Sequence, residues 1–157
     1  MRGTLLVVCP WCDYDTTPER YRLGMRVAGT YSTASLYRRV AALLEETGSR
    51  TVLDVGCAEG VLRAALPRPG PWLVGLDASM TLLRNHPAPA VQGDARRLPL
   101  RDGTVDAVTA LNVLYHLDDP DPAVREARRV LRRGGLLVTS SIARDDSPEL
   151  AAYWTRP

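Results

Sequence analysis

Five short apolar runs recur along the middle of the chain, and each is followed by glycine or polar residues. The runs cover residues 51–56, 72–77, 90–94, 105–111 and 135–141. Segments of this length with continuous apolar character are typical of strands buried on both faces, as in parallel sheets. We therefore expect a five-stranded sheet.

Helical spacing of apolar residues fills most of the intervals between these runs. The pattern predicts helices at 33–47, 60–66, 79–86 and 122–133. For the first of them, Ser32 or Thr33 is the expected N-cap and Gly48 the expected stop.

The helix predicted at 122–133 has its own boundary signals. Asp121 is the expected N-cap, Pro122 fits the first helical position, and Gly134 is the expected end. Residues 1–30 lack a clear period, so we expect an irregular arm there with one short helix near 19–27.

Strands that alternate with helices predict a doubly wound α/β fold with a mostly parallel sheet and helices on both faces. The corresponding Rossmann-like strand order is 3-2-1-4-5. We divide the chain into an N-terminal arm (1–31), this α/β domain (32–145) and a tail with a short helix (146–157). In such a fold, ligands bind beyond the carboxyl ends of the strands, which places a site after residues 56, 77, 94 and 111.

Composition and charge remove several classes of function. The chain has 157 residues and a formal net charge of +2, and its arginines are interspersed with acids. This balance does not favour a nucleic-acid partner. No apolar run approaches the roughly 20 residues of a membrane span, and the N-terminal run is too short for a secretory signal. We expect a cytoplasmic protein with no membrane partner.

The cysteines offer weak support for a metal. Cys9 and Cys12 form a CPWC pair, but a closed zinc site needs four ligands. The other candidates, Cys57, His86 and His116, lie in segments that look functional for other reasons. We therefore favour an N-terminal turn and expect no metal.

Two acids at strand ends indicate a nucleoside. Asp77 follows Gly56 by about twenty residues, the offset of a carboxylate that accepts both hydroxyls of a ribose. Asp94 ends the third apolar run, where its carboxylate could accept from an exocyclic amine such as adenine N6.

The glycine turn after the first strand does not match a dinucleotide or triphosphate site. The dinucleotide template G-x-G-x-x-G, laid on Gly56, places Ala58 at its second glycine and Val61 at its third. The chain has no lysine for a phosphate loop. The turn instead reads G-x-A-x-G.

Four ordered motifs resemble those of the class I S-adenosylmethionine-dependent methyltransferases. They are VLDVGCAEG, VGLDAS, GDARRLPLRDGTVDAVTALNVLYHL and ARRVLRRGGLLVTS, within residues 50–141. The resemblance implies S-adenosylmethionine as cofactor and S-adenosylhomocysteine as product. One departure is Ala58, which replaces the usual middle glycine. Because alanine accepts most conformations that are not left-handed, we expect the cofactor still to fit.

The resemblance also implies a role for individual residues. Asp54 would position the amino group of the methionine moiety, Asp77 would bind the ribose, and Asp94 with the Ala95 N–H would read the adenine edge. The resemblance places Gly56, Cys57, Ala58 and Gly60 in the turn beneath the methionine moiety. It also places Ala78 and Met80 against adenine, and Asn112 beside the sulfonium.

Methyl transfer from a sulfonium needs mainly an aligned nucleophile, and a base only for a poor one. Tyr115 and His116 are the candidate catalytic groups, although His116 could instead bond locally in its loop. Tyr31 could close over the cofactor or pack in the core. For Cys57 we favour a small packed side chain over a nucleophile.

The acceptor itself is not encoded in a motif. We favour an O, N or C nucleophile of a small molecule. The alternatives are an RNA or protein methyltransferase, and a catalytically silent or truncated S-adenosylmethionine-binding or assembly domain. No strand candidate follows residue 141, so we expect the family's C-terminal β-hairpin to be lacking, and either a homodimer or the C-terminal helix to cover the edge of the fifth strand.

Overall fold

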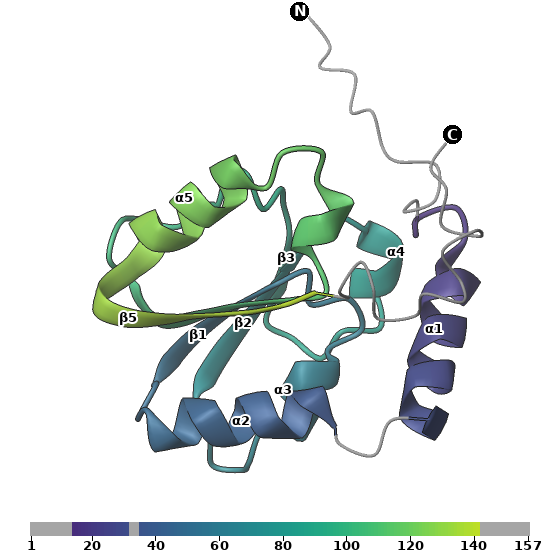
Figure 1. Ribbon diagram of the computed structural model, residues 1–157, viewed down its shortest axis with the longest axis horizontal. Coiled ribbons are helices and arrows are strands. Elements are labelled where there is room, and N and C mark those ends of the chain that lie inside the picture. The colour runs from purple at the N-terminus through teal and green to yellow at the C-terminus, as the bar shows by residue number, and fades with distance from the viewer. Residues whose placement is uncertain (1–13, 32–34, 142–157) are drawn as a thin grey trace, which may run out of the picture.

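The computed structural model describes residues 14–31 and 35–141, with only the backbone described for 28–31. Its sheet has five strands in the order β3-β2-β1-β4-β5, and every neighbouring pair is parallel. Figure 1 shows this sheet with helices on both sides. The doubly wound, Rossmann-like fold with strand order 3-2-1-4-5 is thereby confirmed. The strands are β1 (Thr51–Val55), β2 (Trp72–Asp77), β3 (Ala90–Gln92), β4 (Val105–Leu111) and β5 (Leu131–Ser140).

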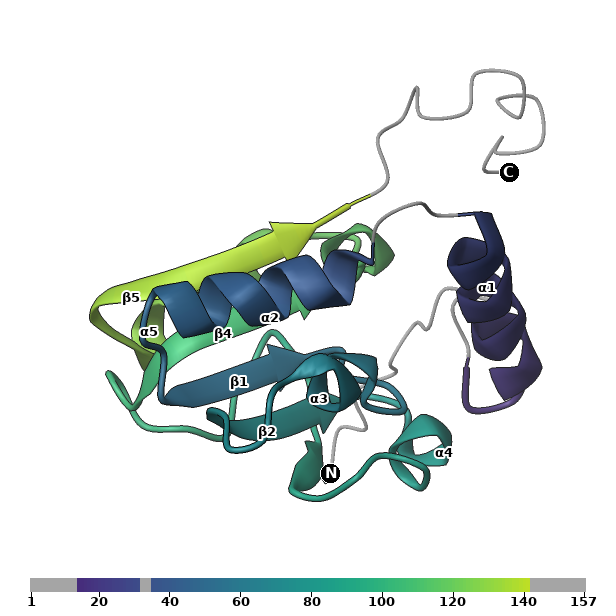
Figure 2. The same cartoon turned by 90° about the horizontal axis from the view of Figure 1, so that it is seen from below.

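The helices form one layer on each face of the sheet. In both views α2 and α3 cover one face and α5 covers the other (Figures 1 and 2). Helix α1 stands apart, beyond the carboxyl ends of the strands. The elements are α1 (Pro18–Tyr31), α2 (Leu36–Glu46), α3 (Val61–Ala65), α4 (Met80–Leu83), the 3₁₀ turn η1 (Leu114–His116) and α5 (Asp121–Val130).

Two apolar cores lie on opposite faces of the sheet because side chains alternate along each strand. Val52 of β1 packs with Leu44 of α2 and Leu62 of α3. Its neighbour Leu53 packs on the other face with Ala127 and Val130 of α5. These central strands are buried on both faces, which explains why their sequences read as continuous apolar runs.

The boundary between α5 and β5 differs from the prediction. The helix ends at Val130 and the strand begins at the next residue, so Gly134 does not end the helix. The guanidinium of Arg132 donates to Asp106 at 2.6 Å across the sheet edge. At the other end, Asp121 is the first helical residue and Pro120 takes the cap position, so the predicted Asp121 cap is wrong. The Asp121 N–H instead donates to the Asp119 carboxylate at 3.0 Å.

Three other boundaries are corrected near the N-terminus and β3. The arm contains a 14-residue helix, α1, where we expected a short one. Helix α2 is capped by Ser35, whose hydroxyl accepts from the Arg38 N–H at 3.4 Å, and not by Ser32 or Thr33. Strand β3 ends at Gln92, since Asp94 begins a tight turn in which the Arg97 N–H donates to its carbonyl at 2.9 Å.

Some predictions fall outside the described residues or remain untested. Cys9, Cys12 and the tail at 146–157 lie outside them. Within the described part of the chain, β5 pairs only with β4, and its coverage by a second copy stays a prediction. No helix among the residues described is long and apolar enough to cross a membrane, and no group of three or more metal-ligating side chains occurs there.

Candidate cofactor site

The turn between β1 and α3 is the centre of the candidate site. Gly56 and Gly60 have φ angles of 68° and 84°, a left-handed region that favours glycine. A Cβ on Gly56 would collide with the Val113 side chain, and one on Gly60 would lie 2.9 Å from the His86 ring. Both glycines are therefore required by conformation and by space.

Ala58 differs from our expectation. Its φ angle is 46°, so this position does adopt the left-handed conformation that alanine disfavours. Residues held in such conformations concentrate at binding sites, where surrounding contacts impose them. Here the constraint includes a hydrogen bond of 2.8 Å from the Ala58 N–H to the Asp77 carboxylate.

Asp77 ends β2 with its carboxylate directed at the same turn. One oxygen accepts from Ala58 and the other from the Ser79 N–H, also at 2.8 Å. Burial raises the pKa of Asp77, and the backbone hydrogen bonds oppose that shift. The structure therefore places a fixed, partly shielded carboxylate at the carboxyl end of β2, beside the glycine turn.

Asp54 lies one strand away and is almost fully enclosed. Its side chain is 4% exposed, and Thr109 of β4 donates its hydroxyl hydrogen to it at 2.6 Å. Burial raises the pKa of Asp54 to about 7, with the Thr109 hydrogen bond opposing and the charge of Asp77 adding to the shift. A nearby cation would stabilise its ionised form.

Asn112 directly follows β4, at the same carboxyl edge of the sheet as Asp54 and Asp77. It has a φ angle of 58°, which is uncommon for a residue with a side chain. Its N–H donates to the Ser140 carbonyl at 3.1 Å, and its side-chain oxygen accepts from the Ser140 hydroxyl at 3.2 Å. The end of β5 thus holds Asn112 in place beside the turn.

Asp94 lies at the same edge but already has a partner. Its carboxylate forms an ion pair with Arg96 at 2.7 Å, and the hydrogen bonds from Arg96 lower its pKa. Ala95 next to it is partly buried against the α5 side of the sheet. An adenine amine at this point would compete with, or add to, the Arg96 contact.

The two expected adenine contacts have different environments. Met80, at the start of α4, is 43% exposed and so available to a ligand. The Ala78 carbonyl accepts from the Gln92 side chain at 2.9 Å, which connects the end of β2 to the end of β3.

Cys57 of the glycine turn is buried, and burial raises the pKa of its thiol, in keeping with a packed side chain.

The predicted catalytic pair lies in η1, directly after Asn112. The rings of Tyr115 and His116 are tilted, with centroids 4.3 Å apart, and Tyr14 meets His116 edge-on at 5.9 Å. Burial lowers the pKa of His116, which favours a neutral imidazole at neutral pH. Tyr31 is the last residue of α1, and its side chain lies outside the described atoms.

Contacts of the N-terminal segment with the site were missed by the sequence reasoning. Arg22 of α1 pairs with Glu59 in the glycine turn at 2.8 Å. Asp15 accepts from the Ser79 hydroxyl at 2.7 Å and from the Thr81 N–H at 3.0 Å. Charged residues far apart in sequence and without a spacing rule give no signal of such pairing.

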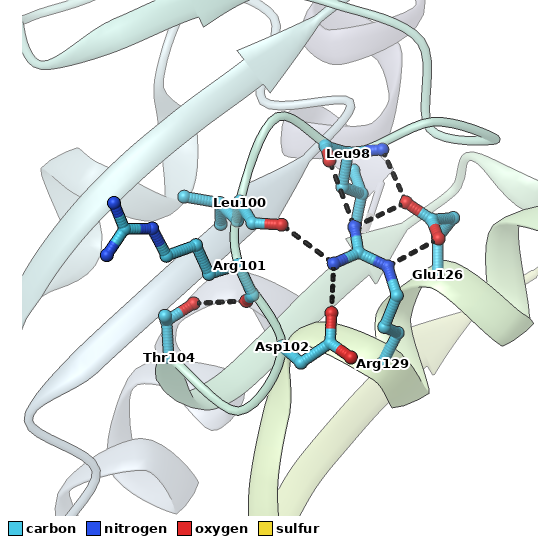
Figure 3. Close-up of polar contacts among 7 residues, drawn as sticks. All are labelled: Leu98, Leu100, Arg101, Asp102, Thr104, Glu126 and Arg129. Carbon is cyan, nitrogen blue, oxygen red and sulfur yellow. Dashed lines mark hydrogen bonds and ion pairs between the residues drawn. The ribbon is translucent and has the colours of Figure 1, made fainter.

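A second missed feature is the arginine network that holds the loop after Asp94. Arg129 of α5 donates to the carbonyls of Leu98 and Leu100 and pairs with Asp102 and Glu126 (Figure 3). Glu126 in turn accepts from the Leu98 N–H at 2.8 Å. This network fixes the loop from β3 to β4 against α5.

Comparison with known proteins identifies the family of this chain. Residues 53–139 match the methyltransferase domain family. The chain is 35% identical over 132 residues to a demethylmenaquinone methyltransferase of Streptomyces avermitilis, covering 80% of this chain and 56% of that protein. It thus spans little more than half the length of this relative.

Solved structures share the fold over most of the described chain. An S-adenosylmethionine-dependent methyltransferase of Thermotoga maritima, named a possible histamine N-methyltransferase, has a TM-score of 0.68 at 23% identity, covering 86% of this chain and 63% of that one. The [4+2]-cyclase SpnF has a TM-score of 0.59 at 28% identity, covering 66% and 44%. The family match, the motifs and the strand order together place this chain in the class I S-adenosylmethionine-dependent methyltransferases.

Proposed function

We propose that the chain binds S-adenosylmethionine at the carboxyl edge of the sheet and transfers its methyl group to a small-molecule acceptor. The observation that supports this most directly is the Asp77 carboxylate, held against the glycine turn by the Ala58 N–H. A fixed carboxylate beside a glycine turn suits a ribose diol and leaves no requirement for a phosphate.

The residues present fit the cofactor. Gly56 and Gly60 keep Cβ atoms away from the turn, so the backbone can approach a ligand closely. Asp77 would accept from the ribose hydroxyls, while Met80 and Ala78 would pack on adenine. The cofactor supplies a methyl group already activated by a sulfonium. The protein's task is then alignment, which can contribute several kcal/mol (about 7 or more in favourable cases) to barrier lowering.

Asp54 would balance the positive charge of the methionine end. Its pKa of about 7 in the free protein reflects burial without a cationic partner. A cationic amino group nearby would favour the carboxylate form and so gain a charge-assisted interaction. Asn112, fixed by Ser140, would lie alongside.

His116 and Tyr115 would act on the acceptor. A neutral imidazole can accept a proton from a hydroxyl or amine as it attacks, and burial favours that neutral form in His116. Tyr115 lies against His116 and would orient it or bind the acceptor.

Relatives support a small-molecule acceptor without identifying it. The Streptomyces avermitilis relative is named for demethylmenaquinone, a small molecule, and the balanced charge of this chain does not favour RNA. The cyclase SpnF, however, shares the fold under the name of another reaction. A fold alone does not establish methyl transfer, and a silent cofactor-binding domain is the second candidate.

Two measurements test the proposal. Calorimetry with S-adenosylmethionine and S-adenosylhomocysteine should give saturable binding to the folded chain. If neither ligand gives a binding heat, the cofactor site is refuted. A methyl-transfer assay over a panel of phenols, amines and quinols should release S-adenosylhomocysteine. Binding without turnover on any acceptor of the panel would favour the silent domain. If turnover is observed, His116→Gln should lower it while leaving cofactor affinity within about twofold of the wild type.

A further inference from the structure

His86 is the one histidine whose environment the mechanism above does not use. It follows α4, its backbone N–H donates to the Leu83 carbonyl at 3.0 Å, and the residue is 9% exposed. Neither ring nitrogen has a hydrogen-bond partner, and these are the sole buried side-chain nitrogen or oxygen atoms without one among the described residues. Unpaired buried polar atoms are rare in native proteins and call for an explanation.

The ring of His86 fills the space behind the cofactor turn. A Cβ on Gly60, the residue that starts α3, would lie 2.9 Å from its Cδ2 atom. A Cβ on Gly75, inside β2, would lie 2.8 Å from its Nε2 atom and 2.6 Å from the Cys57 sulfur. The imidazole, together with Pro87 at Gly60 and Cys57 at Gly75, therefore occupies the space of two missing side chains, between the turn and the strand that ends in Asp77.

Packing alone does not account for a histidine here. A hydrocarbon side chain of similar size would fill this space without burying two unpaired nitrogens, which carry a desolvation penalty. Glycine inside a strand also weakens it, so Gly75 is tolerated because another group approaches closely. The combination indicates that the imidazole itself has a use.

The surroundings of His86 favour the neutral ring over the imidazolium. Burial lowers its pKa, and the charge of Arg63 on α3 acts in the same direction. Asp77 opposes these effects from the end of β2, and the Cys57 thiol beside the ring is uncharged because burial raises its pKa. The Pro87 backbone opposes the lowering of the His86 pKa more than Asp77 does, although it does not meet hydrogen-bond geometry with either ring nitrogen, and burial remains the largest cause.

We propose that His86 is a positioning residue for cofactor binding: its neutral ring holds the turn at Gly60 and Cys57 against β2, and protonation releases the turn. The inference rests on the proposed function, because it assumes that this turn binds the cofactor. Released from behind the turn, the ring would leave Gly60 and Gly75 without the contact that now orders them. Cofactor affinity should consequently fall in mild acid.

The test is the pH profile of S-adenosylhomocysteine binding to the 157-residue chain. Because only the neutral ring would hold the turn, the dissociation constant should rise by up to about tenfold for each pH unit below the pKa of His86 in the free protein, which burial holds below its ordinary value of 6.5. We expect this rise in the wild type as the pH is lowered from about 6.5 to about 5. In His86→Phe the part of the rise due to the ring should disappear, whereas the part due to the Asp54 carboxyl, whose pKa is about 7, should remain; affinity at pH 7.5 should stay within about twofold of wild type.

One control separates His86 from the other histidine. His116→Gln, which removes that second ring, should keep the wild-type profile. An unchanged acid rise in His86→Phe would overturn the inference. Absence of binding by the wild type at every pH would refute the proposed function instead.

A measurement on the wild type covers the case in which His86→Phe does not fold. The NMR titration of the His86 ring should give a lower pKa in the protein saturated with S-adenosylhomocysteine than in the free protein. Linkage requires this if binding favours the neutral ring. Equal pKa values in the two states would overturn the inference.

Discussion

The carboxylate of Asp77, at the end of β2, accepts a hydrogen bond of 2.8 Å from the backbone N–H of Ala58 in the turn after β1. This bond joins the two strand ends that the candidate site depends on. A ligand hydroxyl that reaches the same carboxylate would therefore meet a group already fixed in position.

Asp77→Asn should weaken binding of S-adenosylhomocysteine by about tenfold or more, since charge-assisted hydrogen bonds contribute about 1.5–3 kcal/mol each. The variant keeps the size of the side chain but supplies only one accepting oxygen for Ala58, Ser79 and a ribose. Calorimetry at pH 7.5 measures the change.

Glu46→Gln removes an equal charge from the exposed end of α2 and serves as the matched control. It should bind like the wild type. Unaltered affinity in Asp77→Asn would show that the ribose interacts elsewhere.

Ala58→Gly should stabilise the free protein. The left-handed conformation costs alanine about 1–2 kcal/mol, whereas glycine adopts it freely and loses only about 0.5–1 kcal/mol through the entropy of the unfolded chain. The net gain in the free energy of unfolding should be about 0.5–1 kcal/mol. Urea unfolding of the variant and wild type measures it.

Ala64→Gly is the control for that substitution. Ala64 is exposed in α3, where glycine should destabilise by about 0.5–1 kcal/mol. If both glycine variants lose stability, the φ angle of Ala58 is not a strained one in solution.

Much of the site could be predicted because it follows local rules. Apolar runs gave the strands, and the carboxyl-end rule then placed Gly56, Asp77 and Asn112 at one edge. These inferences need only the periodicity of side chains and the handedness of crossovers.

The missed features depend on contacts between distant segments. The rest of α1, helix α2 and strand β1 lie between Arg22 and Glu59 in the sequence, and no local pattern pairs them. Likewise Arg132 and Arg133 fit the end of α5 by helical spacing, yet both lie in β5, where Arg132 pairs with Asp106. Tertiary contacts override propensity at such boundaries.

Arg129→Lys should lower the melting temperature and increase hydrogen exchange in residues 98–104. Arg129 spans two carbonyls and two carboxylates with its planar fork, whereas a lysine ammonium cannot reach all of them at once. The charge is retained, so the effect reports geometry. The exposed neighbour Arg128 gives the control, because Arg128→Lys should change neither measurement; equal effects of the two variants would remove the special role of Arg129.

The stability advantage of Asp54→Asn over the wild type should grow as the pH rises from 5 to 8 in the absence of cofactor. The pKa of Asp54 in the folded protein is raised to about 7, chiefly by burial, above the ordinary value of 3.8. A raised carboxyl pKa contributes stability below pH 3.8, and this contribution is lost as pH rises through 7. Asparagine does not ionise, so the variant should exceed the wild type by about 2 kcal/mol or more at pH 8.

At pH 5 the wild-type carboxyl is protonated in the folded state but largely ionised in the unfolded chain, so the advantage of Asp54→Asn should be smaller than at pH 8 and should disappear only below pH 3.8. Urea unfolding at both pH values measures the difference, and Thr109→Val, which removes the hydroxyl donor at 2.6 Å, shows how much of it the hydrogen bond contributes. Asp54→Asn should also bind S-adenosylhomocysteine more weakly, because it lacks the negative charge that would interact with the cationic amino group. A constant stability difference across pH would mean that Asp54 is already ionised in the folded protein, and that its burial is compensated by a partner other than the cofactor.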